Sequence, residues 1–277
     1  MIYYTGLNRK SSELLHILER DLQETLAKLQ THELELSNYT IDIDVSSPAE
    51  KFREQLSTTR LTEKESDRIS NSPDNSERIL PETIDKQVVH CQMNAFIETL
   101  LIYGSSLKNL ELISKDEKAR AFNNYLSGLC IMLSILKKQS EIYFDDLLAE
   151  MQDAPEGIDR EKFERAKRTA GDIIKIALPL AVESIALENV GTAKLKGIIE
   201  EKLKLSDQGE FVKFFASFLY SDLRLPGLQS VLNQYVKGIR DKSVLKIVYF
   251  KLMYYYQFRY FGTAIDSFLV NMLADIN

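Results

Sequence analysis

The sequence has few of the residues on which several common classes of protein depend. Its 277 residues include 2 cysteines, 3 histidines, 11 glycines, 6 prolines and no tryptophan. Two cysteines are too few for a disulfide framework, and we interpret Cys91 and Cys130 as reduced thiols in a cytoplasmic protein. The low glycine and proline contents disfavour turn-rich sheets and favour helices.

Short motifs for nucleotide binding and hydrolysis are also missing. The dispersed glycines form neither a Walker-type phosphate loop nor a Gly-x-Gly-x-x-Gly turn, and no Gly-x-Ser-x-Gly elbow occurs. Glu13 and His16 make one Glu-x-x-His pair, whereas di-iron helical bundles need two such pairs and two further carboxylates. The sequence therefore predicts no catalytic residue, no metal site and no cofactor.

Apolar runs and charge limit the partners of the chain. No segment joins a basic start to the apolar run of a signal peptide, and the apolar run 173–187 contains Lys175 and Glu183. We expect no transmembrane helix and a cytoplasmic location. The net charge of −6, with acidic residues in excess over 1–158, makes nucleic acid an unfavourable partner and leaves a protein partner or self-association.

Apolar residues recur at helical spacing along most of the chain. The fold class that we predict is mainly α: a multi-helix bundle with an N-terminal amphipathic helix and one short β-strand. A polar stretch separates the two parts of the pattern. We therefore predict a helix and strand arm over 1–58, a polar connector over 59–80 and an all-helical body over 81–277.

Several local signals place the ends of the predicted helices. An amphipathic helix with a leucine stripe is predicted to begin at Ser11. A second helix is expected to begin at Pro81 and to stop at Gly104. Ser114, as part of a capping box, is expected to begin another. A separate short helix is predicted over 142–151. Pro179 is expected to kink a later helix because proline donates no backbone hydrogen bond.

Residues 39–45 alternate apolar and polar side chains and are rich in β-branched residues, which predicts a β-strand. A single strand cannot satisfy its own backbone. It must therefore pair with residues 2–5 in a small β-hairpin, with another segment or with a partner chain. We predict that Tyr39, Ile41 and Ile43 bind a partner by strand addition.

The polar residues of the segment 245–261 share no single helical face, so the segment needs neighbours on every side. Sibling helices or a partner could supply them. Aromatic side chains are dense in this segment, and tyrosine is favoured where an apolar surface meets a polar rim. The residues predicted to form a helical interface are Tyr254, Tyr255, Phe258 and Arg259.

An acidic segment supplies the alternative to an interaction protein. The sequence Asp145-Asp146-Leu147-Leu148-Ala149-Glu150 resembles the aspartate-rich motif of class I terpene synthases, which are all-α enzymes that hold magnesium. The second metal motif of that family is missing, so we do not assign the chain to it. The main hypothesis is a non-enzymatic interaction or scaffold subunit of a cytoplasmic multiprotein assembly. The alternatives are a magnesium-dependent all-α enzyme that uses Asp145, Asp146 and Glu150, and a membrane-active helical protein.

Overall fold

The regular structure of the described residues is helical. The computed structural model describes residues 11–29, 36, 39–43, 87–109, 113–150, 159–204, 208–258 and 260–276. Every regular element within these residues is a helix, which confirms the mainly α class. The elements are α2 (Ser11–Lys28), α5 (Gln87–Asn109), α6 (Lys115–Glu150), α7 (Arg160–Val190), a 3-10 turn (Ala193–Leu195), α8 (Lys196–Lys204), α9 (Glu210–Asp222), α10 (Leu228–Gly238), α11 (Lys242–Gln257) and α12 (Thr263–Asp275).

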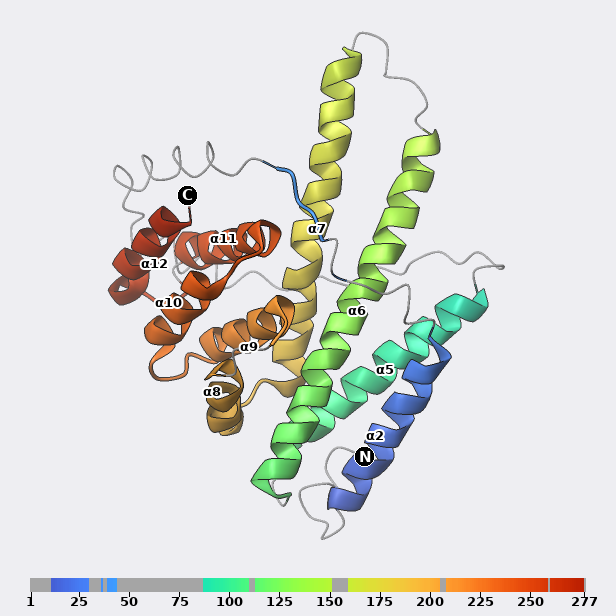
Figure 1. Cartoon of the computed structure of the whole chain (residues 1–277), viewed down its shortest axis with the longest axis vertical. Helices are drawn as coiled ribbons and strands as arrows, with labels where there is room; N and C mark the ends of the chain where they lie inside the picture. The colour runs from blue at the N-terminus through green and yellow to red at the C-terminus, as the bar shows by residue number, and fades with distance from the viewer. Residues whose placement is uncertain are drawn as a thin grey trace.

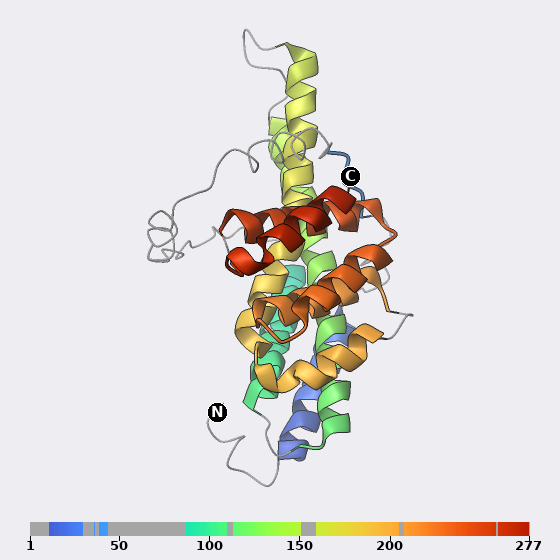
Figure 2. The same cartoon turned by 90° about the vertical axis from the view of Figure 1, so that its left-hand side faces the viewer.

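The two longest helices, α6 and α7, form the axis of the molecule (Figure 1). On one side of this pair lie α5 and α2, which pack against each other through a leucine stripe that includes the buried Leu15, Leu18 and Leu22. On the other side, α8 to α12 stack along the pair, as the perpendicular view shows (Figure 2). The predicted domain limits at 58 and 80 fall outside the described residues.

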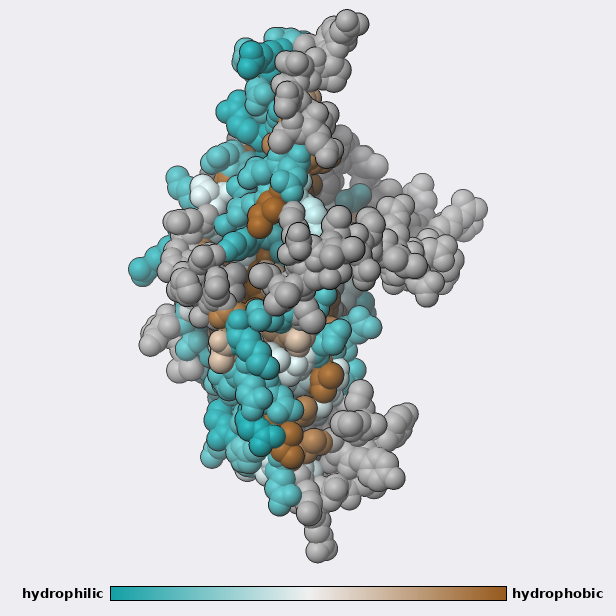
Figure 3. Space-filling view, turned by 90° about the vertical axis from the view of Figure 1, so that its right-hand side faces the viewer, coloured by the Kyte–Doolittle hydropathy of each residue, from teal (hydrophilic) through white to brown (hydrophobic). Residues whose placement is uncertain are grey.

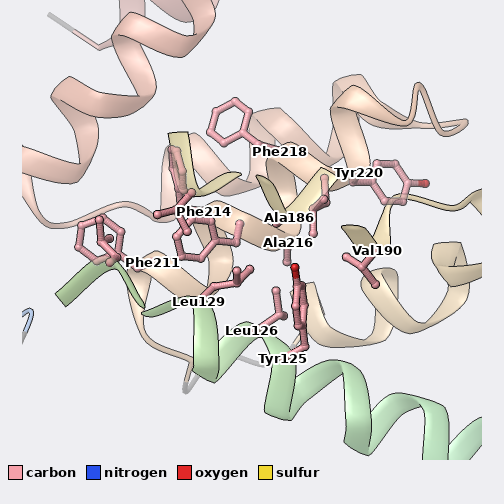
Figure 4. Close-up of a cluster of buried hydrophobic side chains, with 14 of the residues drawn as sticks. Tyr125, Leu126, Leu129, Ala186, Val190, Phe211, Phe214, Ala216, Phe218 and Tyr220 are labelled. Carbon is pink, nitrogen blue, oxygen red and sulfur yellow. The ribbon is translucent and has the colours of Figure 1, made fainter. Parts of the chain in front are cut away.

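The core is centred on α9, where helices α6, α7 and α9 meet (Figure 4). Every residue of α9 from Phe214 to Ser221 is buried, so α9 is a helix with neighbours on all sides rather than one with a single apolar face. Its two interior serines fit because they are small. The Ser221 hydroxyl donates to the backbone oxygen of Ser217 at 2.8 Å and needs no partner outside the helix.

Two helices differ from the pattern that their sequences predict. Gly104 does not end a helix but lies within α5, where a Cβ atom would come within 2.4 Å of the Tyr125 ring of α6. Glycine is present there because the two helices approach closely, not because the helix stops. The predicted helix over 142–151 is not separate, since α6 continues to Glu150. Helix α7 is continuous through Pro179, as predicted, and the kink at this residue stays a prediction.

The capping box at Ser114 is confirmed. The Ser114 hydroxyl accepts from the backbone N–H of Glu117 at 3.2 Å, and the Glu117 carboxylate accepts from the backbone N–H of Ser114 at 3.2 Å. The Ser114 hydroxyl also donates to the Glu117 carboxylate at 2.8 Å, and this bond, together with the one from the Ser114 N–H, lowers the pKa of Glu117. This reciprocal pair fixes the start of α6.

The predicted β-strand is not formed within the described residues 39–43. These residues have no regular secondary structure and run alongside α7 (Figure 1). They do keep the alternation of a strand, because Tyr39 and Ile41 are buried while Thr40 and Asp42 are exposed. The alternating burial was predicted correctly, but the prediction of a strand was wrong. The backbone groups of residues 40–42 bind side chains of α7 and α11 instead of another strand. The proposed pairing with residues 2–5 falls outside the described residues.

Candidate functional site

A group of charged side chains lies inside the protein where α7, α9 and α11 meet. We call Glu183, Asp222, Lys251 and Tyr255 the ionic cluster. The Lys251 ammonium donates to Glu183 Oε2 at 2.5 Å and to Asp222 Oδ2 at 3.0 Å, and the Tyr255 hydroxyl donates to Asp222 Oδ1. Two carboxyl groups therefore share one lysine, and each of the three helices contributes at least one member.

Burial controls the charge of the ionic cluster. It raises the pKa of Glu183 to about 8, an effect that the positive charge of Lys251 opposes and the negative charge of Asp222 reinforces. Burial by itself would lower the pKa of Lys251, but attraction to Glu183 and Asp222 outweighs it and the pKa is raised. Glu183 therefore holds a proton more tightly than an exposed glutamate does, while the two carboxyl groups beside Lys251 help it to keep its positive charge.

The ionic cluster is closed to solvent. Glu183 is 0 % exposed and Lys251 is 7 % exposed, so no substrate can reach either side chain in this conformation. What the cluster can do is connect α7, α9 and α11 through directional bonds in an otherwise apolar interior. It also fixes Tyr255, whose ring stacks on Tyr260 at 5.2 Å between centroids and meets Phe261 at 4.7 Å.

The predicted helical interface separates into buried and exposed residues. Tyr255 is 0 % exposed, whereas its neighbours Tyr254 and Phe258 are 50 % and 40 % exposed. With the half-buried Phe250, they occur at intervals of four residues. Phe250 and Tyr254 lie on one face of α11, and Phe258, the residue that caps the C-terminal end of this helix, continues that face. We call Phe250, Tyr254 and Phe258 the aromatic stripe. The rings of Tyr254 and Phe258 are in contact, with centroids 4.7 Å apart.

The shielding predicted for the segment 245–261 is therefore only partial. Most of α11 is buried by its sibling helices, but the aromatic stripe remains open to solvent at its C-terminal end. The fourth predicted residue of this interface, Arg259, lies outside the described residues.

The residues predicted for strand addition are largely covered by their own chain. Tyr39 and Ile41 are each 3 % exposed, and Ile43 is half-buried against the core. The Tyr39 ring meets Phe211 at 5.1 Å. The structure thus brings Tyr39 and Ile41 to α7 and α11, far along the chain from their own position. Strand addition to a partner stays a prediction.

The acidic residues of the alternative hypothesis lie near the end of α6. Asp145 and Asp146 are exposed, and the side chain of Glu150 is outside the described part of the chain. Among the side chains that the structure describes, no group of three or more His, Cys, Asp or Glu residues is arranged to hold a metal ion. The use of these residues in a magnesium enzyme stays a hypothesis.

Sequence reasoning missed the ionic cluster, although it left a signal. Glu183 lies within the apolar run 173–187, and Lys251 lies within the aromatic segment. A charged residue that interrupts an apolar helix needs a buried partner of opposite charge. Two such residues of opposite sign are therefore candidates for a pair, but the sequence does not show that Asp222 joins them.

None of the described helices has the length and apolar character that a bilayer crossing requires. In comparisons with known proteins, no family model matches the chain, and neither does any curated protein or any solved structure.

Proposed function

We propose that this protein is a non-enzymatic interaction subunit of a cytoplasmic assembly and that it binds its partner through the aromatic stripe of α11. The observation that carries this proposal is the exposure of Tyr254 and Phe258, two large rings in mutual contact. Tyrosine and other aromatic residues contribute most to the affinity of many protein interfaces. Residues four apart on one helix are the anchors of helix-in-groove recognition.

Other exposed apolar residues give weaker support for an interface. Ile17, Ile102 and Tyr143 lie on α2, α5 and α6. On the face that these helices form, apolar residues show as separate brown groups within a mainly teal surface (Figure 3). Scattered apolar side chains are normal on a protein surface. The aromatic stripe differs because two of its rings touch and the third continues the same face.

The buried contacts of Tyr255 hold the backbone of the aromatic stripe in place, which favours binding without a change of conformation. Tyr255, which lies between Tyr254 and Phe258 in sequence, is held by Asp222 and stacked on Tyr260. The backbone that presents the two exposed rings is therefore anchored to the ionic cluster. A pre-organised surface loses little conformational entropy on binding, which increases its affinity.

The test compares complex formation by two forms of the full chain. Tagged protein and its Tyr254→Ala/Phe258→Ala variant are purified under native conditions, and light scattering coupled to size exclusion measures the mass of each. We expect the natural chain to run as a complex with itself or another protein and the variant to lose it. Truncating two interface rings typically weakens binding by about 2–4 kcal/mol, which corresponds to a loss of about 30-fold to 1,000-fold.

Two control variants make the result specific. Ile102→Ala removes an apolar residue that is 53 % exposed on α5 and should leave the mass unchanged. Tyr255→Ala removes a core ring and should lower the melting temperature, whereas the double variant should melt close to the natural chain. The proposal fails if the natural chain is a monomer without a partner, or if the double variant retains the complex.

A further inference from the structure

Four side chains on two helices hold the main chain of residues 39–43. Asp172 and Lys175 belong to α7, while Ser243 and Lys246 belong to α11; we call these four residues the clamp. Each helix contributes one acceptor and, three residues later, one lysine. This spacing places both side chains on the same face of the helix, about one turn apart.

The clamp binds peptide groups on both edges of the segment. On α11, Ser243 Oγ accepts from the N–H of Ile41 at 3.0 Å and Lys246 donates to the C=O of Ile41 at 2.7 Å. On α7, Lys175 Nζ donates to the C=O of Thr40 at 3.0 Å, and Asp172 Oδ2 accepts from the N–H of Asp42 at 2.9 Å.

This division is the hydrogen-bond pattern of a strand inside a sheet. In an extended chain the N–H and C=O of one residue point to one edge, and the facing groups of its two neighbours point to the other. Here side chains of α11 bind both the N–H and the C=O of Ile41, while side chains of α7 bind the C=O of Thr40 and the N–H of Asp42. Side chains of two helices thus replace the two neighbouring strands.

Pro179 explains why the clamp accepts a tyrosine. In an α-helix the carbonyl of Lys175 would bind the N–H of residue 179, but proline has none. The Tyr39 hydroxyl donates to that carbonyl at 2.5 Å, and its ring lies against Phe211. Burial also raises the pKa of Tyr39 well above its ordinary value, so the hydroxyl keeps the proton that it donates.

We propose that the clamp is a binding site for an extended peptide of the pattern tyrosine-x-aliphatic, which residues 39–43 occupy within their own chain and which a partner segment of the same pattern can fill. Four of the five polar contacts go to main-chain groups, which any residue but proline provides. Only Tyr39 and Ile41 are buried, so only these two positions require particular side chains. The occupant is therefore a partner strand with a tyrosine and, two residues later, an aliphatic residue.

The intramolecular segment competes with such a partner. A tethered ligand has an effective concentration on the order of millimolar. A partner in trans can therefore displace residues 39–43 only if it binds the clamp tightly or if the binding of residues 39–43 to the clamp is weakened. Weakening the segment by substitution therefore exposes the site. This mode of binding does not use the aromatic stripe, so its failure would leave the proposed function untouched, and the reverse also holds.

The experiment measures peptide binding to the full chain. A fluorescein-labelled peptide with the sequence of residues 37–45, Ser-Asn-Tyr-Thr-Ile-Asp-Ile-Asp-Val, is titrated with the Tyr39→Ala/Ile41→Ala variant, and fluorescence anisotropy is recorded. We expect saturable binding at least tenfold tighter than to the natural chain, whose site is occupied. Adding Lys175→Met and Lys246→Met should weaken binding about tenfold or more, whereas Lys237→Met, on α10, should not.

A modified peptide tests whether the main chain is recognised. N-methylation at the position of Ile41 removes the N–H that Ser243 accepts and should lower the affinity about tenfold. Circular dichroism establishes that each variant is folded. The Tyr39→Phe chain, which loses one hydrogen bond and keeps the apolar contacts, provides a second background and should also bind more tightly than the natural chain. Folded variants that do not bind the peptide, or that bind the N-methylated peptide equally well, overturn the proposal.

Discussion

Replacing Tyr39 with phenylalanine should destabilise the protein by an amount that depends on Pro179. The hydroxyl of Tyr39 donates to the carbonyl of Lys175 at 2.5 Å, and the side chain is 3 % exposed. Removing the hydroxyl leaves that carbonyl without a donor in a site that water reaches poorly. An unpaired polar group of this kind costs about 1–3 kcal/mol, so we expect Tyr39→Phe to lower the free energy of unfolding by about 1–2 kcal/mol.

The same substitution should cost less when Pro179 is replaced by alanine. Alanine at 179 restores a backbone N–H that can bind the Lys175 carbonyl within α7, which gives this carbonyl a donor besides the Tyr39 hydroxyl. We expect Tyr39→Phe to cost less than about 0.5 kcal/mol in the Pro179→Ala chain. The difference between the two backgrounds is the coupling energy of a double-mutant cycle, about 1 kcal/mol.

Urea denaturation followed by circular dichroism measures all four chains of the cycle. Equal slopes with shifted midpoints show that stability, rather than the surface exposed on unfolding, has changed. Pro179→Ala on its own tests whether the proline strains α7 or fits it. Equal costs of Tyr39→Phe in both backgrounds would refute the reasoning, because the hydroxyl would then not be replacing the bond that proline lacks.

Three further predictions concern Glu183, Gly104 and Gly197. For Glu183, the folded-state pKa of about 8 lies above the ordinary value of 4.5, so its stabilising contribution is complete below pH 4.5 and is lost as the pH rises through 8. Thermal unfolding measured across this window should show that the stability of Glu183→Gln depends less on pH than that of the natural chain, by up to about 1.4 kcal/mol per pH unit. Parallel curves of stability against pH for the two chains would contradict this prediction. Gly104→Ala should lower the free energy of unfolding by about 1–3 kcal/mol, because the new Cβ atom would come within 2.4 Å of the Tyr125 ring. Gly197→Ala, whose Cβ atom would have no neighbour within 4 Å, should raise the free energy of unfolding by about 0.5–1 kcal/mol in the same urea denaturation assay.

The helical architecture could be predicted because each helix carries its own local signals. The leucine stripe of α2 and the capping box at Ser114 are both present in the structure. Errors arose where a tertiary contact decided the outcome. Gly104 looks like a helix stop in sequence, but the ring of Tyr125 occupies the space beside it. The burial of α9 on all sides could likewise not be derived from its own residues, because it depends on the neighbouring helices that cover it.

The clamp shows why part of the site could not be read from the chain. Alternating burial requires only that one face of an extended segment meets an apolar surface, and residues 39–43 meet this condition without any sheet. What the pattern leaves open is the partner of the peptide groups. Lysine and serine side chains on helices satisfy them as well as a strand would, and neither has a distinctive sequence context. Pro179 was the one informative residue, because a proline inside a buried helix leaves a carbonyl that must find a donor elsewhere. A search for that donor would favour tyrosines in segments that lack a backbone partner of their own, and Tyr39 is such a residue.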